Sequence, residues 1–270
     1  NPAMQAHVTR LMDIEAALRR ALGTNSLELY LQPQVNAHYE VIGGEILLRW
    51  NDPVLGAVSP DEFIPVAEST GLILPLGSWV LREACKILRD WQSNPLLAGL
   101  SLAINISPRQ FRHAGFVQQV EQCISDFDLT GELIELEITE GMLIDDFSNT
   151  VIRMGELQAM GVRFSLDDFG TGYASLSYLK RLPLFQLKID QSFIRDLLTD
   201  SNDEAIVTAT LSLGSSLGLE VIAEGVETLA QMQRLTELGC GKFQGYYIGH
   251  PQPVREWQLR LQQSLSLGAP

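Results

Sequence analysis

Polar side chains that could bind a metal ion recur along this sequence at intervals of 20 to 60 residues. Each stands in or at the end of a different short apolar stretch: Glu45, Asn105, Glu137, Asp167, Lys188, Glu224 and Gln244. One buried polar residue usually forms a structural hydrogen bond, but a pattern that recurs in every stretch indicates a shared site. Burying this many charges without a function would be costly.

The charges of this set predict a site for divalent cations. Five negative charges come from Glu45, Glu137, Asp167, Asp168 and Glu224. Only Arg49 and Lys188 oppose them. All-oxygen ligands select Mg²⁺ or Mn²⁺, and the adjacent Asp167 and Asp168 are suited to bridging two ions. Two such ions form the usual clamp for attack of water on a phosphodiester, so the residues alone indicate metal-dependent phosphoester chemistry.

A zinc site built from histidine and cysteine is not expected. The four histidines lie far apart in the sequence, at His7, His38, His113 and His250. The three cysteines, Cys85, Cys123 and Cys240, form no Cys-x-x-Cys pair. Isolated cysteines in odd number are typical of reduced, buried thiols in a cytosolic protein.

The elements that would position the polar set alternate between strand and helix. We predict strands at 28–35, 41–50, 101–107, 133–139, 162–168, 184–190, 219–225 and 242–248. Helical patterns lie near 60–68, 73–92, 114–127, 149–160, 174–181, 203–218, 227–238 and 253–264. Alternation favours a parallel sheet, and eight strands without a linker favour a (β/α)8 barrel over two doubly wound domains.

The strands are not apolar on both faces, as those of a parallel sheet usually are. In residues 134–139, Glu135, Glu137 and Thr139 alternate with three apolar residues, and three other strands show the same alternation. Because successive side chains on a strand point to opposite faces, each polar set shares one side. We expect the apolar set to face the helices and the polar set to face the barrel axis, with the active site at the mouth where the strands end.

Composition and charge exclude several classes of function. The chain has 270 residues, 46% of them hydrophobic, and a formal net charge of −14. Such an acidic surface repels polyphosphate backbones and anionic membranes, so we expect no DNA or RNA polymer as a partner. The longest apolar window, 95–107, is too short and too interrupted to insert into a bilayer.

Two interpretations of the N-terminal segment stay open. Residues 2–22 have helical spacing of apolar side chains, and Gly23 ends the pattern. This helix could pack on its own domain, or it could connect to an upstream domain.

Nine motifs, in order and at barrel spacing, resemble those of the EAL-domain phosphodiesterases, which hydrolyse the bacterial second messenger cyclic di-GMP to linear pGpG. The motifs begin at Tyr30, Glu45, Phe63, Asn105, Glu137, Asp167, Lys188, Ala223 and Gln244. The resemblance covers residues 25 to 252, nearly the whole chain. It implies a modified TIM (β/α)8 barrel whose first strand is antiparallel to the others. We therefore expect a connector helix at 1–22 and an EAL phosphodiesterase domain at 23–265.

The resemblance also implies roles for single residues. Glu45, Asn105, Glu137 and the bridging Asp167 resemble ligands of a first metal ion, and Asp168 resembles a ligand of a second. The catalytic residues would be Lys188, which orients the attacking water, Glu224, as a second-metal ligand or general base, and Gln244, which supports them. Gln32, Leu48 and Arg49 would contact the substrate. The cofactors implied are two Mg²⁺ or Mn²⁺ ions, with Ca²⁺ inhibitory.

Regulation and context follow from the same resemblance. Glu140 would anchor the loop that starts at Gly170, and Tyr173, Leu176, Leu179 and Leu182 fall at helical spacing that suits either a core face or a homodimer interface. The full-length protein would be cytoplasmic, or the cytoplasmic part of a membrane-anchored protein, with upstream sensor or GGDEF-type domains. A catalytically silent cyclic di-GMP receptor is the alternative, and an enzyme for another phosphoester is a third.

Two positions depart from the family pattern. Ile46 stands where alanine is usual, and by alternation it points away from Glu45, so we expect a packing change without loss of the ligand. His250 stands where arginine is common. It could change a contact at the rim of the site or lie on the surface without a role.

Overall fold

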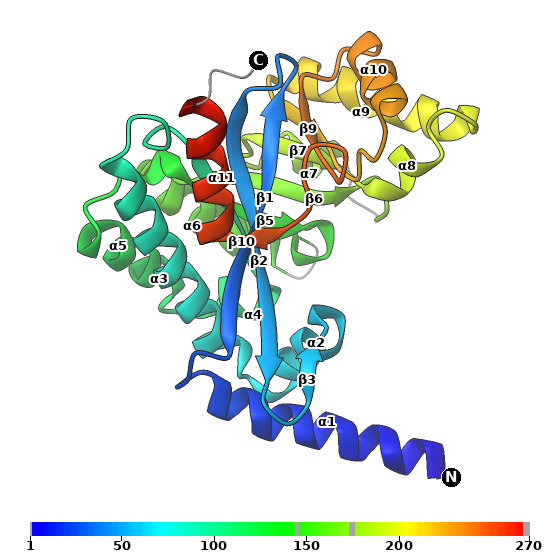
Figure 1. Ribbon diagram of the computed structural model, residues 1–270. Coiled ribbons are helices and arrows are strands. Elements are labelled where there is room, and N and C mark those ends of the chain that lie inside the picture. Colours follow the sequence, from blue (N-terminus) through cyan, green and yellow to red (C-terminus); the bar gives the residue numbers. More distant parts are fainter. Residues whose placement is uncertain (1, 144–145, 173–175, 267–270) are drawn as a thin grey trace.

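The computed structural model describes residues 2–143, 146–172 and 176–266, and its centre is a closed barrel of eight strands (Figure 1). The barrel strands are β1 (Leu27–Asn36), β2 (Val41–Asp52), β4 (Ser101–Asn105), β5 (Ile134–Thr139), β6 (Arg163–Phe169), β7 (Gln186–Ile189), β8 (Glu220–Ala223) and β9 (Lys242–Gln244). Each pairs with the next, and β1 closes the ring by pairing with both β2 and β9. This confirms the (β/α)8 architecture expected from the sequence.

Strand β1 is antiparallel to both of its barrel neighbours, as the resemblance implied. Gln32 lies opposite Glu45 on β2, and Gln34 lies opposite Gln244 on β9. The remaining barrel pairs are parallel. Because β1 and β2 form a hairpin with only four residues between them, they must run in opposite directions.

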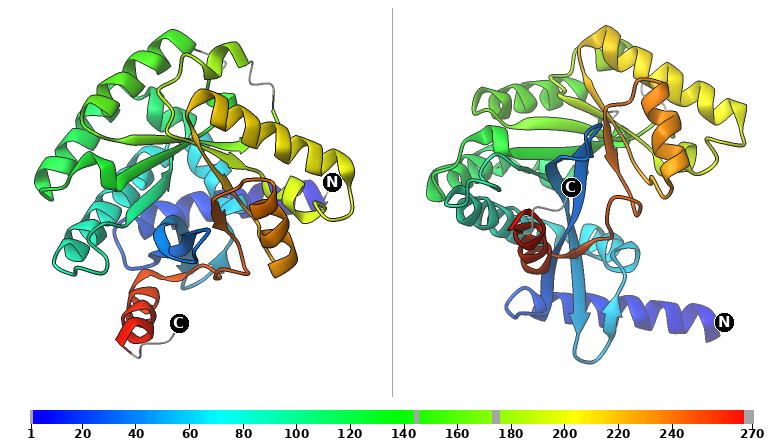
Figure 2. Two further views of the ribbon diagram at one scale, coloured as in Figure 1. Left: turned by 90° about the horizontal axis from the view of Figure 1, so that it is seen from above. Right: turned by 45° about the horizontal axis from the view of Figure 1, so that its top comes forward.

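Helices surround the barrel (Figure 2). They are α1 (Pro2–Ala21), α2 (Pro60–Thr70), α3 (Ile73–Gln92), α4 (Pro108–Arg112), α5 (Phe116–Asp126), α6 (Phe147–Ala159), α7 (Leu176–Leu179), α8 (Gln191–Arg195), α9 (Ser201–Leu217), α10 (Leu229–Glu237) and α11 (Val254–Ser266). Two 3-10 turns occupy Gly131–Leu133 and Glu140–Leu143, and two short strands, β3 (Gly56–Val58) and β10 (Gln252–Pro253), extend the sheet.

The apolar interior is divided into two cores. The larger lies between the barrel strands and the surrounding helices. The smaller joins α1 and α2 to the outer end of the β1–β2 hairpin, where Ile14, Leu18, Trp50 and Phe63 are buried together. In Figure 1, α1 crosses this end of the hairpin. The C-terminal end of β2, which follows Glu45 in the sequence, is therefore held in position by packing against α1 and α2.

The first half of α1 presents an apolar face that is exposed. Met4, Val8 and Met12 are 72%, 50% and 65% exposed, whereas Ile14, Ala17 and Leu18 are buried. The C-terminal half of the helix therefore packs on its own domain. Among the described residues, no helix is both long enough and apolar enough to cross a membrane.

Replacing Ile46 with alanine is expected to reduce stability much more than activity. Ile46 is 3% exposed and packs in the larger core, on the face of β2 opposite Glu45. The cavity should lower the free energy of unfolding by about 2–4 kcal/mol. The rate of hydrolysis, measured well below the unfolding temperature, should stay within about tenfold of the parent rate. A loss of activity as severe as that of a metal-ligand variant would show that Ile46 acts on the site.

Candidate active site

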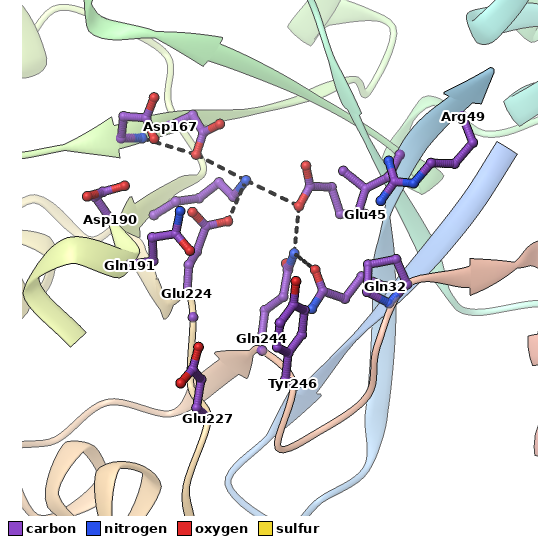
Figure 3. A pocket seen from close by; sticks show the side chains of 16 residues that line it. Gln32, Glu45, Arg49, Asp167, Asp190, Gln191, Glu224, Glu227, Gln244 and Tyr246 are labelled. Atoms are coloured by element: carbon purple, nitrogen blue, oxygen red, sulfur yellow. Dashed lines mark hydrogen bonds and ion pairs between the residues drawn. The ribbon is translucent and has the colours of Figure 1, made fainter. Parts of the chain in front are cut away.

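Most of the polar side chains expected at the barrel axis converge on one pocket, although Asn105 and Glu137 are not among its lining residues. It has a volume of about 400 Å³ and is lined by Gln32, Glu45, Leu47, Arg49, Asp167, Asp168, Lys188, Asp190, Gln191, Glu224, Gly225, Glu227, Gln244, Gly245, Tyr246 and Pro251. Figure 3 shows side chains from opposite sides of the barrel pointing toward one another across this pocket. The strand alternation in the sequence therefore placed most of the polar set correctly.

The Lys188 ammonium lies at the centre of four carboxylates. Its Nζ is 2.6 Å from Glu137 Oε1, 2.7 Å from Glu224 Oε1 and 3.1 Å from Asp167 Oδ1. Glu45 Oε2 is farther away, at 3.8 Å. Burial alone would lower the pKa of Lys188, but the four carboxylates hold it well above its usual range. One buried cation thus faces four acids, and the site keeps an excess of negative charge.

A chain of amides holds Glu45 in place. Asn105 Nδ2 donates to Glu45 Oε1 at 2.7 Å. Gln244 Nε2 donates to Glu45 Oε2 at 2.6 Å (Figure 3). Gln244 in turn accepts from Gln34 and donates to Gln32. Burial would raise the pKa of Glu45, but Lys188 and the two amides hold it below its usual value. Glu45 is therefore an ionised acceptor in a fixed orientation.

Three other carboxyl groups of the site have raised pKa values, so their ionised forms are disfavoured. Burial, then repulsion by Glu45, holds the pKa of Glu137 well above its usual range. Burial raises the pKa of Glu224 to about 8, although Lys188 opposes the shift. Burial, then repulsion by Asp167, raises the pKa of Asp168 to about 6. Bound cations would remove this cost, because they supply the missing positive charge.

The donor atoms fit divalent cations. One carboxylate oxygen from each of Asp167, Asp168 and Glu224 lies within 4.8 Å of the others. Glu137 Oε2 is buried and accepts no hydrogen bond from any described residue, so a buried carboxylate oxygen is left for a ligand. Asp168 has a left-handed backbone, with φ of 54°, which is costly for a residue with a side chain and is typical of functional sites.

Glu140 is placed to anchor the loop after Asp168. Its Oε1 accepts a hydrogen bond of 3.0 Å from the Gly170 amide. At Gly172 a Cβ atom would collide with Glu140 Oε2, so the loop approaches the carboxylate closely. This geometry supports the role expected from the sequence. Residues 173–175 of the same segment, including Tyr173, lie outside the described residues, as does the Leu176 side chain.

Replacing Glu140 with alanine should reduce turnover although Glu140 touches no expected metal ligand. Without the acceptor, Gly170 and the adjoining Asp168 lose their fixed position. We expect kcat to fall about 10- to 100-fold, as when a residue that orients a ligand is removed. The measurement is steady-state kinetics beside Glu140→Gln, which keeps an acceptor oxygen. An alanine variant with the parent kcat would contradict loop anchoring.

One expected substrate contact lies outside the lining of this pocket. Leu47 lines the pocket and Leu48 does not, and the contact at Leu48 stays a prediction. Side chains alternate along β2, so Glu45, Leu47 and Arg49 share one face, while Leu48 points to the other and packs beside both cores. The other expected contacts, Gln32 and Arg49, do line the pocket.

Several pocket residues were missed, although the sequence carried a signal for some of them. Asp190 lies two residues after Lys188, so alternation puts both on one face, and Asp190 is one cause of the raised pKa of Asp168. Glu227 belongs to the motif that begins at Ala223. Tyr246 is 55% exposed at the rim, where its ring stacks on His250 with centroids 4.2 Å apart. Nothing in the sequence indicates that stack.

The comparison with known families decides what this arrangement is. The model of the EAL domain matches residues 15–251. The chain belongs to the EAL domain family. The match covers the barrel strands and every residue expected to bind metal or substrate.

Curated members of the EAL family align along most of the chain. The bifunctional diguanylate cyclase/cyclic di-GMP phosphodiesterase MucR of Pseudomonas aeruginosa is 44% identical over 94% of this chain and 37% of its own length. The oxygen sensor protein DosP of Escherichia coli is 40% identical over 95% of this chain and 32% of its own length. The chain thus spans about a third of these relatives.

Solved EAL structures superpose closely on this one. The phosphodiesterase of PaMucR in complex with c-di-GMP has a TM-score of 0.85 and 45% identity, and the match covers 92% of this chain and 99% of that one. The EAL enzyme Bd1971, bound to cAMP and cyclic-di-GMP, has a TM-score of 0.88 and 33% identity, covering 95% of this chain and 69% of that one.

Proposed function

We propose that this EAL domain hydrolyses cyclic di-GMP to linear pGpG by in-line attack of water on one phosphodiester. The observation that carries the proposal is the ring of carboxylates around Lys188, which keeps an excess of negative charge and a buried acceptor that no described residue hydrogen-bonds. The EAL domain of MucR, which is similar to this chain along its whole length, supports the choice of substrate.

The expected ligands fall into two groups at the barrel mouth. Glu45, Asn105, Glu137 and Asp167 would hold a first Mg²⁺ or Mn²⁺ ion. Asp168, with Asp167 bridging and Glu224 beside them, would hold a second. When bound, the ions would lower the pKa of the attacking water and neutralise charge on the phosphate oxygens.

The remaining residues position the reactants. Lys188 would orient the attacking water and stabilise charge that develops at phosphorus, because it is held as a cation among the ligands. Gln244 would keep Glu45 in place through its 2.6 Å hydrogen bond. Arg49 and Gln32 lie on the wall of the pocket, where Arg49 would bind a phosphate and Gln32 would contact the substrate.

Metal dependence tests the proposal. We expect hydrolysis with Mg²⁺ or Mn²⁺, none after chelation, and none with Ca²⁺. Ca²⁺ prefers 6–8 ligands at about 2.3–2.6 Å, so it would enlarge a cluster suited to ions at roughly 2.0–2.1 Å. The assay resolves cyclic di-GMP from pGpG by chromatography after incubation with each ion. Equal rates with Ca²⁺ would contradict the in-line geometry, and binding without hydrolysis under every ion would favour a silent receptor.

We also propose a setting for the domain. The catalytic unit would be residues 23–265, joined through the helix at 1–22 to upstream sensor or GGDEF-type domains in the cytoplasm, and paired as a homodimer through the segment after Asp168. Leu179 and Leu182 are buried in the core, which agrees with the core-face interpretation for these two positions. The exposed Tyr178 is available for a dimer contact. Sedimentation velocity would test the pairing, and a fully active monomer would contradict it.

A further inference from the structure

Arg49 lies at the boundary between two hollows. It lines the active-site pocket on the β2 side, together with Glu45 (Figure 3). It also lines a second hollow of about 750 Å³, together with Glu28, Tyr30 and Asn51. A long, flexible side chain in this position could direct its guanidinium toward either hollow. Its use in the active site therefore depends on what holds it.

By strand register, the nearest acidic residue to Arg49 is Glu28, which lies at the second hollow and not at the active-site pocket. Glu28 on β1 lies directly opposite Arg49 on β2, and the residues of such a cross-strand pair have Cβ atoms about 4.5–5.5 Å apart. Opposite charges in this arrangement attract. Yet in the part of the chain that the structure describes, Arg49 forms no ion pair with Glu28 or any other acid. Glu28 is exposed and lines only the second hollow.

The guanidinium lies instead over an aromatic ring. Arg49 Cζ is 5.4 Å from the centroid of the Tyr30 ring, within the range of a cation–π contact. Arg49 Nη1 also donates to the Leu48 carbonyl at 3.0 Å. Tyr30 lies opposite Leu47, on the same face of the hairpin as Glu45 and Arg49. Stacking uses the flat face of the guanidinium and leaves the other N–H groups at its edge free for an anion.

We propose that Tyr30, which itself lines the second hollow beside Glu28, is a positioning residue whose ring face holds the Arg49 guanidinium out of an ion pair with Glu28. Arg49 is then ready to bind a phosphate of the substrate without first breaking an ion pair. The inference rests on the proposed function, because it assumes a phosphodiester substrate. It assigns to Tyr30 no contact with the reacting atoms, so its effect should be on binding.

The test compares Tyr30→Leu with Tyr30→Phe in steady-state hydrolysis of cyclic di-GMP with Mg²⁺. Leucine keeps apolar bulk but removes the ring face, and phenylalanine keeps the ring face. We expect Tyr30→Leu to raise KM about fivefold with kcat within about twofold of the parent, and Tyr30→Phe to match the parent. Tyr30→Met serves as a second ring-free variant should the leucine protein fold poorly.

A second substitution tests the competition with Glu28. In Tyr30→Leu, Arg49 should turn to Glu28, so adding Glu28→Gln should bring KM back toward the parent value. Glu28→Gln alone should have little effect, because Tyr30 already holds Arg49.

The outcomes separate this inference from the proposed function. A parent that neither binds nor hydrolyses cyclic di-GMP would overturn both. An active parent with unchanged KM in Tyr30→Leu and Tyr30→Met would overturn only the role of Tyr30. Equal loss in Tyr30→Leu and Tyr30→Phe would overturn the stacking, because the hydroxyl would then be responsible. A KM that Glu28→Gln does not restore would overturn the competition with Glu28.

Discussion

Glu45→Ala is expected to abolish hydrolysis while the barrel remains folded. Glu45 is the one carboxylate of the ring that two amides fix, at 2.7 Å from Asn105 and 2.6 Å from Gln244. Its removal deletes a charged ligand and frees both amides. We expect kcat/KM to fall on the order of 10³-fold or more, as when an electrostatic catalytic group is lost.

The fold should survive the Glu45→Ala substitution because the barrel wall depends on the apolar face of β2. Asn105 loses its acceptor, but Gln244 keeps its hydrogen bonds with Gln32 and Gln34, so the free energy of unfolding should fall by only about 1–3 kcal/mol. Glu45→Gln is the matched control, since it keeps the volume and one acceptor but not the charge, and it should be nearly as inactive as alanine. Hydrolysis by Glu45→Ala near the parent rate would remove Glu45 from the metal site.

Lys188→Met should reduce both the rate of hydrolysis and the free energy of unfolding. Lys188 is 1% exposed and, among the residues that the structure describes, it is the only cation within 4.0 Å of these four carboxylates. Without it the metal-free protein would bury acids that lack a partner, which should lower the free energy of unfolding by about 3–5 kcal/mol. Turnover should fall at least about 10²-fold, because the attacking water and the developing charge lose their partner.

Thermal unfolding with and without divalent ions separates the two effects of Lys188→Met. Added Mg²⁺ should raise the unfolding temperature of the variant more than that of the parent, because the ions replace the missing positive charge. Arg234 provides a control, since its pairs with Glu204 and Glu237 lie at the surface and include no carboxylate of the ring. Arg234→Met should respond to Mg²⁺ as the parent does. Equal metal responses in the Lys188 and Arg234 variants would contradict the central place of Lys188.

The sequence predicted the barrel because its strands carry an unusual pattern. Glu137, Asp167 and Lys188 each occupy the polar side of an alternating strand, and the structure brings both carboxylates within 3.1 Å of the Lys188 ammonium. The predicted strand at 242–248 is longer than β9, because the chain turns at Gly245, whose added Cβ would collide with the Val226 backbone. The alternation of polar and apolar residues therefore predicts that a strand is present better than it predicts where the strand ends.

Other features depend on contacts that a linear pattern does not contain. Leu47 lines the pocket although the expected contact was at Leu48, and counting alternate residues from Glu45 would have indicated Leu47. The smaller core joins Ile14 of α1 to Trp50 of β2, two residues with no local relation. The stack of Arg49 on Tyr30 depends on hairpin register. Strand β3 and the five-residue helices α4 and α8 are too short for a periodic signal.

Product analysis in water enriched in heavy oxygen tests the central claim most directly. The parent protein, with cyclic di-GMP and Mg²⁺, should yield pGpG as the sole initial product, and mass spectrometry should find a single heavy oxygen on its terminal phosphate. That label records attack of one solvent water on phosphorus. Cyclic di-GMP that is bound and then recovered intact, beside folded protein and bound metal, would contradict an active phosphodiesterase.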